Sequence, residues 1–487
     1  MNSAVSFNIR VALGLLAACA LFNISFAEET LLPDLGDRES SVLSPYQEKK
    51  LGDQILKLVR RTVPTVKDPI LKYFVRKNLF ELAEHSDLNT SVLVPIIVDS
   101  EDFNAFAAPG GIVGINSGLL TFALDIHEYS SVVSHELAHL SQRHFARRKE
   151  EAEQLNLRHS LGWLVSAAIF AIGGTDPGLA AALVNTEMNE RLGFKYSRHQ
   201  EHEADRIGLD TLTDAGYDPM GAVRMFVRMK EHYKFDSAIA ESNEFLRTHP
   251  LTDDRISDLR AYARSEERQT WKSLEYQLMR VRVAHSSFKS ASAALAHANS
   301  LAGEELHEKY DIALALVQGD EKQRAVELME DVYSAQPNSI VVIACYADLL
   351  VKADQSEQAL KIVDAALANT PNNQPLSLIK VDALRALNRY EEATSILLRI
   401  VRQSSEDTDL WFELEEVAGL AQNIFEVHRA RAEQYALKGQ YAEAIENLQL
   451  AKKNNDDKSS ILEARLNQRI LELREAAEVD SWLTESR

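Results

Sequence analysis

The stretch SVVSHELAH, residues 131–139, holds two histidines four positions apart and a glutamate beside the first: His135, Glu136 and His139. Residues four apart on a helix lie on one face, so both imidazoles can bind one metal ion. Glu136 lies off that ligand line, but close enough to hold a water molecule that the ion polarises. It can then take the proton of this water and pass it to a leaving amine. The alternative is a surface helix with two chance histidines, and the apolar residues around the motif favour a buried active-site helix instead.

A third ligand is needed to complete such a site. His144 lies one position before the place that the H-E-x-x-H-x-x-G-x-x-H spacing requires, so we expect it to be a flanking residue that faces solvent. The stretch YSRHQEHEADRIGLD (196–210) is predicted to be helical, with Glu201 and Asp205 four apart. Glu201 can reach the ion, and Asp205 can accept the free ring N–H of a ligand histidine. Residue types alone leave the choice open among Glu201 and its neighbours, which are His199, His202 and Glu203.

The pair of motifs H-E-L-A-H and E-x-x-A-D resembles the M48 family of zinc peptidases. The resemblance implies an α+β zincin-like (gluzincin) metalloprotease domain that is mostly helical with a small sheet. It also implies one Zn²⁺ per chain, held by His135, His139 and Glu201, with Glu136 as the catalytic base. The segment 103–120 matches the family's strand before the metal helix, which is implied to pair with the backbone of a peptide substrate.

Two further positions follow from the resemblance. His249, before Pro250, matches a loop histidine that occupies the fourth position on the ion and keeps the enzyme latent. A loop histidine that merely packs is the alternative. Arg282 matches an arginine that stabilises the oxyanion of the tetrahedral intermediate, and Arg280 is the second candidate for this role.

The N-terminus carries the features of an export signal. Arg10 precedes an apolar run from Val11 to Phe22, and small residues before Glu28 predict cleavage after Ala27. We therefore expect a signal peptide over residues 1–27 and a location in the periplasm, in contact with the outer membrane. The alternative is a lipoprotein acylated at Cys19, although that cysteine lies inside the apolar run rather than at its end.

The mature chain divides into two halves with different patterns. Residues 28–265, the predicted peptidase domain, mix a strand at 91–100 and a turn, strand and turn at 108–120 with helical stretches. Residues 266–487 show only helical patterns with a 34-residue period. This period predicts an all-α solenoid of tetratricopeptide repeats, and an irregular helical bundle is the alternative. The positions that carry the period are Ala325, Ala359 and Ala393, the prolines Pro337 and Pro371, and, after a longer gap, Ala444.

Charge and hydropathy bear on the partners. The net charge of −20 argues against a nucleic acid, because phosphate binding needs a basic surface. The segment 161–184 is nearly free of charge and is split by GGTDPG into two short arms. We expect a buried core hairpin there, and a surface hairpin that dips into a membrane or an assembly partner is the alternative.

An export signal, an M48-like domain and C-terminal repeats together resemble the periplasmic members of this family in Gram-negative bacteria. The resemblance implies a zinc metalloendopeptidase with chaperone activity in the assembly and quality control of outer-membrane β-barrel proteins. Its implied partners are the β-barrel assembly machinery, misassembled outer-membrane proteins and peptide substrates. One alternative is a chaperone or scaffold in which proteolysis is secondary. Another is a repeat scaffold with a purely structural zinc, and the presence of Glu136 argues against it because such a site needs no base.

Overall fold

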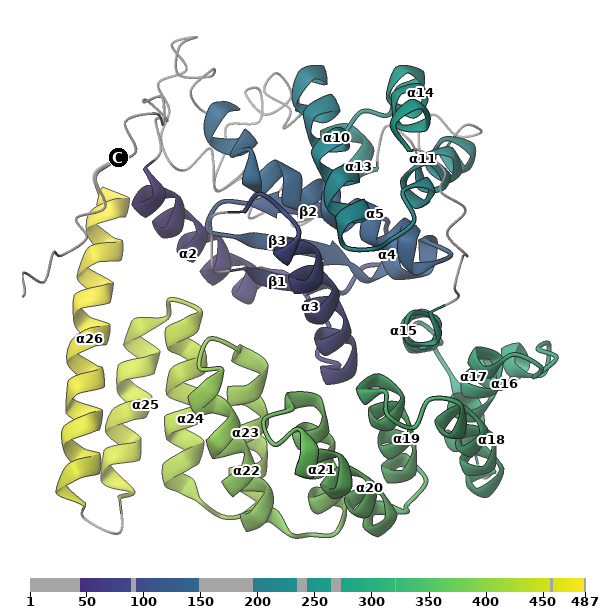
Figure 1. Cartoon of the computed structure of the whole chain (residues 1–487). Helices are drawn as coiled ribbons and strands as arrows, with labels where there is room; N and C mark the ends of the chain where they lie inside the picture. The colour runs from purple at the N-terminus through teal and green to yellow at the C-terminus, as the bar shows by residue number, and fades with distance from the viewer. Residues whose placement is uncertain are drawn as a thin grey trace, which may run out of the picture. The chain divides into compact units, whose positions relative to one another are not determined.

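The computed structural model describes residues 44–88, 93–148, 196–233, 243–263, 273–319, 321–455 and 459–485 (Figure 1). The predicted signal peptide and the apolar segment 161–184 lie outside these residues. Within the described ranges, no helix is both long and apolar enough to cross a bilayer.

A three-stranded sheet lies at the centre of the N-terminal half. Its strands are β1 (Val94–Val98), β2 (Ala105–Ala108) and β3 (Ile112–Asn116), in the order β1-β3-β2. β1 runs parallel to β3, and β2 runs antiparallel to it. The strands predicted at 91–100 and within 108–120 are therefore present. The turn expected after β3 is instead a short helix, α4 (Ser117–Phe122), because the backbone N–H groups after β3 continue into helical hydrogen bonds such as the one from Ala123 to Leu119.

Helices cover both faces of the sheet. On one face, the apolar side of α2 (Pro45–Thr62) packs on Ile96, Phe106 and Ile112. The opposite face, which includes Val113, belongs to the large core that α3 (Pro69–Glu84) and α5 (Ile126–Ser141) share. Side chains alternate between the faces along a strand, so neighbouring residues of β3 serve different cores.

Four more of the described helices belong to the N-terminal half, and two of them pack directly on α5. They are α10 (Arg198–Asp214), α11 (Met220–Tyr233), α13 (Glu244–Thr248) and α14 (Asp253–Tyr262).

From α15 onward all described elements are helices, and from α17 to α26 consecutive helices pack side by side (Figure 1). Ala325, Ala359 and Ala393 lie in every second helix, and Ala444 lies three helices after Ala393; all four are fully buried where their helix meets its partner, as the repeat pattern predicts. The described helices from α15 onward are α15 (Leu274–Ser286), α16 (Ala291–Ala298), α17 (Leu306–Val317), α18 (Lys322–Ala335), α19 (Ile340–Lys352), α20 (Ser356–Asn369), α21 (Gln374–Ala386), α22 (Tyr390–Gln403), α23 (Thr408–Leu420), α24 (Ile424–Leu437), α25 (Tyr441–Lys453) and α26 (Ser460–Glu485).

The tight turns inside the repeats show the same period. Asp354, Asn388 and Gln422 adopt a left-handed conformation, with φ of 61°, 59° and 57°, and they lie 34 residues apart. Such a residue after a helix end closes the turn by a hydrogen bond back to the last carbonyls. A further turn of this kind at Gly439, φ 72°, joins α24 to α25 only half a period later. The longer gap before Ala444 is thus one additional helix.

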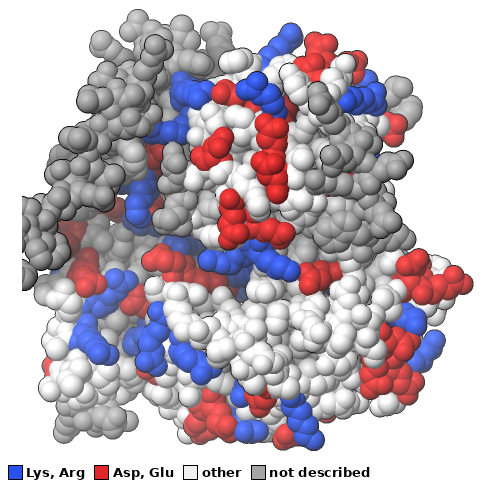
Figure 2. Space-filling view, viewed as in Figure 1, with Lys and Arg blue, Asp and Glu red and all other residues white. Residues whose placement is uncertain are grey.

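Charged side chains of both signs lie in small mixed groups over the face shown in Figure 2, with uncharged areas between them. No continuous field of basic residues covers the described part of this face.

Candidate metal centre

Helix α5 carries the H-E-L-A-H motif through the core. The helix begins after Asp125, whose carboxylate accepts hydrogen bonds from the backbone N–H groups of His127 and Glu128, both at 2.9 Å. This cap satisfies donors that a helix start leaves without a partner. Every residue from Ile126 to His139 is buried, so packed neighbours fix the side chains of the motif.

Helix α10 approaches α5 closely. A Cβ atom on Gly208 would lie only 3.0 Å from the backbone N and Cα of His135, so any larger residue would press the two helices apart. A capping box formed by Ser197 and Gln200 sets the start of α10. Glu201, in the first turn, is thereby held against the two histidines of α5.

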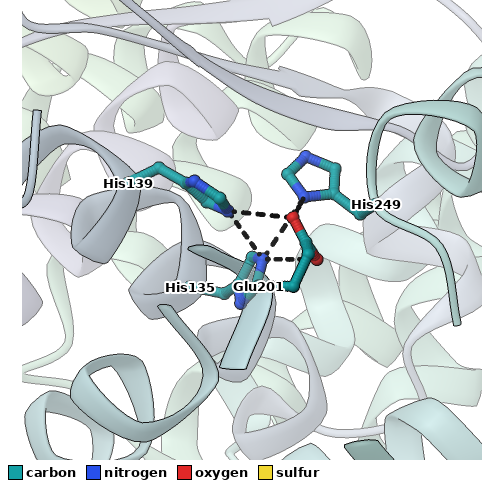
Figure 3. A group of neighbouring side chains, drawn as sticks. All are labelled: His135, His139, Glu201 and His249. Atoms are coloured by element: carbon teal, nitrogen blue, oxygen red, sulfur yellow. Dashed lines mark hydrogen bonds and ion pairs between the residues drawn. The ribbon is translucent and has the colours of Figure 1, made fainter. Parts of the chain in front are cut away.

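Four side chains converge between these helices and the loop after α13 (Figure 3). The Nε2 atoms of His135 and His139 lie 3.0 Å apart. Glu201 Oε2 is 3.7 Å from His135 Nε2, and Glu201 Oε1 is 3.5 Å from His139 Nε2. His249 Nδ1 lies 2.9 Å from Glu201 Oε1 and 3.4 Å from His135 Nε2.

The donor set fits a transition-metal ion. One ligand atom from each of the four residues lies within 4.8 Å of the others. Imidazole nitrogen and carboxylate oxygen are the donors that Zn²⁺ takes, in a tetrahedral arrangement. Burial first, and then the neighbouring charge of His135, lowers the pKa of His139 well below its usual value. The neutral imidazole, which is the form that binds metal, is therefore favoured.

Asp205 lies behind the histidine ligands, where the sequence placed it. Its Oδ1 is 3.0 Å from His135 Nδ1. Arg255, from α14, binds the same carboxylate through Nε (2.6 Å) and Nη2 (2.7 Å), and its Nη1 lies 2.6 Å from Glu201 Oε2. Burial alone would raise the pKa of Asp205, but the charge of Arg255 outweighs it and holds that pKa well below its usual value. The sequence analysis did not select Arg255. The sequence shows it only as a basic residue shortly after His249.

His144 is buried instead of facing solvent, which corrects the expectation from spacing. The chain turns sharply at Arg143, which has a φ of 51°, and this turn directs His144 back toward α5. His144 Nδ1 lies 2.9 Å from His139 Nδ1, and its Nε2 lies 3.1 Å from Glu203 Oε2. A chain of N–H donors from His139 through His144 to Glu203 leaves His139 Nε2 free for the ion. His144 is thus a support of a ligand, and Glu203 is its partner.

The other local candidates for the third ligand point elsewhere. His199 is exposed. His202 lies on the outer side of α10, where its Nδ1 is 3.1 Å from Asp258 Oδ2.

The loop that carries His249 is anchored on two sides. Phe245 stacks on the His249 ring, with centroids 4.7 Å apart, and meets Phe103 edge-on at 4.8 Å. The backbone N–H of Tyr196 donates to Thr248 O at 3.1 Å, and the Tyr196 ring stacks on His139 at 4.0 Å. The imidazole of His249 is therefore fixed over the other three ligands and is only 2 % exposed.

Glu136 is fully buried, and no side chain among the described residues donates a hydrogen bond to its carboxylate, although the backbone N–H of Ala107 in β2 faces it closely enough to lower its pKa against the effect of burial. Its Oε1 lies 3.5 Å from His249 Nε2. Burial raises the pKa of Glu136 to about 7. A carboxyl group with this pKa can both accept and release a proton near neutral pH.

Arg282 is not brought to this group of residues. Its guanidinium donates to Asp68 at the start of α3, to Tyr310 Oη (2.9 Å) and to Asp348 Oδ2 (2.8 Å). Arg280 also points elsewhere, toward Thr121 O at 3.2 Å. The geometry gives neither arginine contact with the reacting atoms, because α15 packs on α4 and α17 and meets α5 at Tyr129, before the H-E-L-A-H motif, through the ring of Tyr276. The cation that does reach the ligands is Arg255.

Comparison with known proteins agrees with this geometry. The model of Peptidase family M48 matches residues 74–263. The chain is 34 % identical over 439 residues to a relative from Vibrio cholerae serotype O1 named as a β-barrel assembly-enhancing protease, with 88 % of this chain and 90 % of that protein covered. It is 27 % identical over 466 residues to the β-barrel assembly-enhancing protease of Escherichia coli strain K12, with 92 % of each covered. The mitochondrial metalloendopeptidase OMA1 of Bos taurus is 35 % identical over 165 residues, which are 34 % of this chain and 31 % of that protein.

The predicted fold class is confirmed by these matches and by the helices and small sheet of the structure.

Proposed function

The chain belongs to peptidase family M48 and is a metalloendopeptidase, and from this premise we propose that it is a periplasmic zinc enzyme of outer-membrane β-barrel assembly and quality control. The observation that carries the proposal is the convergence of His135, His139, Glu201 and His249 beside the buried carboxylate of Glu136.

We assign the zinc ligands to His135, His139 and Glu201. A bound Zn²⁺ would polarise the scissile carbonyl and make water acidic enough to be activated at neutral pH. Asp205 and His144 orient the two imidazoles through the ring nitrogens that face away from the ion. Arg255 neutralises the negative charge that Glu201 and Asp205 bring into the core.

Glu136 is the general base and then the general acid. Its carboxylate can accept the proton of the attacking water, and the same group, whose pKa burial raises, can then protonate the leaving amine. The carboxyl group gains one proton from the water and gives one to the leaving amine, so it ends the reaction in its starting protonation state.

The substrate is an extended segment of polypeptide. Among the described residues β2 pairs with β3 alone, and it packs against α5, which carries Glu136. The other edge of the sheet is covered by an isolated bridge from Thr65 to Val98. A strand added to β2 would place its backbone along the metal helix.

His249 keeps this centre latent. It would hold the position on a bound Zn²⁺ that a substrate carbonyl or water needs, and its burial closes the site to solvent. Cleavage then requires movement of the loop after α13.

The repeats supply the docking surface, and the location is the periplasm after cleavage at Ala27. The relatives from V. cholerae and E. coli are named for β-barrel assembly, and they match this chain through both halves. We therefore infer that the partners of this chain are the β-barrel assembly machinery and misassembled outer-membrane proteins. The latent centre favours a second activity, chaperone-like holding of these clients while His249 blocks cleavage.

Changing Glu136→Gln tests the proposed chemistry. The amide keeps the shape of the side chain but cannot take a proton, so we expect loss of casein cleavage with zinc content unchanged. The measurement is a cleavage time course together with metal analysis by mass spectrometry. Cleavage at the rate of the unaltered chain would refute the role of Glu136. If the chain instead binds no zinc, the assignment of the ligands fails.

A further inference from the structure

Arg255 is a buried cation that contacts both the metal centre and the segment that carries His249. It lies in the first turn of α14, and its side chain is 3 % exposed. Its Nε and Nη2 donate to the two carboxylate oxygens of Asp205, at 2.6 Å and 2.7 Å. Its Nη1 lies 2.6 Å from Glu201 Oε2 and donates to the carbonyl oxygen of Pro250 at 2.9 Å. One guanidinium therefore holds two carboxylates and a backbone carbonyl.

The hydrogen bond to Pro250 extends the reach of Arg255 beyond the two carboxylates. Charge compensation requires only a cation beside those carboxylates, and a neutral carbonyl oxygen adds nothing to it. Pro250 directly follows His249, so a fixed Pro250 carbonyl restricts the backbone from which the imidazole projects. The Phe226 ring lies against the guanidinium, with 4.9 Å between Cζ and the ring centroid, and limits its movement.

The backbone on the two sides of His249 is anchored differently. On the N-terminal side, the His249 N–H donates to Phe245 O at 2.7 Å, at the end of α13. On the C-terminal side, the described residues give Pro250 and Leu251 one hydrogen bond, which comes from Arg255. Without it, these two residues would be held by side-chain packing alone. Arg255 is thus the C-terminal anchor of the segment that places His249 over the other candidate ligands.

We propose that Arg255 is a positioning residue that couples the order of the metal ligands to the block of the centre by His249. This inference rests on the proposed function, in which His249 closes a zinc site. Outward movement of the His249 segment breaks the hydrogen bond to Pro250. It leaves the contacts of Arg255 with Asp205 and Glu201 in place, so the ligands stay ordered while the centre opens.

Changing Arg255→Lys tests this coupling. Lysine keeps the positive charge beside the carboxylates but lacks the planar fork that reaches three partners at once. We expect unchanged zinc content at saturating Zn²⁺ and a roughly fivefold rise in basal casein cleavage, because loss of a hydrogen bond from a charged donor shifts the closed–open equilibrium about tenfold. The gain should appear as a lower KM with kcat little changed, since closure only reduces the fraction that binds substrate. Damage to the ligands would lower kcat instead.

The same change in the His249→Ala background separates the two roles of Arg255. When His249 is absent, nothing remains for the Pro250 bond to hold closed. Arg255→Lys should then alter cleavage by less than about twofold, which is the scatter expected for independent sites.

Hydrogen–deuterium exchange gives a second measurement that needs no cleavage. Residues 243–252 should exchange faster in Arg255→Lys, both with zinc bound and after its removal by a chelator, while helix α3 serves as the reference and stays unchanged. If Arg255→Lys does not fold, Phe226→Leu takes its place. It removes the ring against the guanidinium and should give a smaller change of the same sign in both measurements.

Arg260→Lys, on the exposed side of the same helix, is the matched control and should leave both measurements unchanged. The proposal is overturned if exchange in residues 243–252 and KM are the same in Arg255→Lys as in the unaltered chain. It is equally overturned if Arg255→Lys changes cleavage by the same factor with and without His249. A His249→Ala variant without increased cleavage would instead contradict the block by His249 in the proposed function, and exchange would still decide whether Arg255 anchors the segment.

Discussion

At the scale of single residues, the centre is built in two layers. In the proposed centre His135, His139 and Glu201 supply the donor atoms, and another side chain contacts each of them from the side that faces away from the ion. Asp205 faces His135, and His144 faces His139. The outer groups decide which ring nitrogen carries the proton, so they fix the form of the imidazole that binds metal.

The proposed block of the metal centre by His249 leads to a prediction at this scale. Changing His249→Ala opens the fourth position, so basal cleavage of casein should rise. If the closed state holds about nine molecules in ten, the rise is roughly tenfold. A time course at equal zinc content measures it, with His202→Ala on the outer side of α10 as the matched control. Unchanged or lower activity in His249→Ala would contradict the proposal that His249 blocks the centre.

At the scale of elements, the site depends on how closely α10 approaches α5. Gly208 permits this approach, and Glu201 lies two turns before it on the same helix. The segment before β2 and helix α13 close another side, where Phe103 meets Phe245 and the Phe103 carbonyl accepts a hydrogen bond from Asn243. The four residues of the candidate metal centre come from three segments that are distant in the sequence.

Changing Gly208→Ala should separate the two helices. The added methyl group meets backbone atoms that cannot turn aside, so we expect a loss of about 1–3 kcal/mol in the free energy of unfolding and weaker zinc binding. Urea unfolding and zinc competition with a chelator measure the two effects. Gly319→Ala is the control, because its nearest neighbour would lie at 3.5 Å, an ordinary contact. Equal zinc affinity in both variants would show that zinc binding does not depend on the close approach of α10 to α5.

At the scale of the whole described chain, Arg282 links elements from both halves. Its guanidinium is shared by Asp68, which caps α3, by Tyr310 of α17 and by Asp348 of α19. Burial alone would raise the pKa of Asp348, but the charge of Arg282 outweighs it and sets the pKa at about 2, below the ordinary 3.8. The arginine expected at the oxyanion is thus a structural cation.

The ion pair of Arg282 and Asp348 predicts an acid-sensitive contribution to the free energy of unfolding. Because the folded pKa of Asp348 lies below the unfolded one, its contribution is complete above pH about 4 and is lost as the pH falls toward 2. The shift corresponds to about 2 kcal/mol. Urea unfolding at pH 7, 4 and 3 should show that Asp348→Asn destabilises the chain at pH 7 and that the difference narrows on acidification. A difference independent of pH would contradict this role.

Much of the fold could be predicted because its signals are local. The 34-residue period predicted paired helices, and the structure adds left-handed turns at the same spacing. The β-branched run at 91–100 predicted β1. Helix α4 was missed, since SGLL after a strand carries turn residues, and the helix depends on hydrogen bonds that follow the end of β3.

The sequence alone determined that His135 and His139 share one face and that Glu136 lies beside them, because a helix fixes those relations by its own geometry. It left the third ligand open, and the resemblance to a family, not the spacing, selected Glu201. Only the tertiary structure decided that His144 is buried against His139, that Arg255 reaches Glu201, and that Arg282 does not reach the centre. The reason is physical. A pattern along the chain shows which face of an element is apolar, but the partner on that face is set by the packing of segments far apart in the sequence.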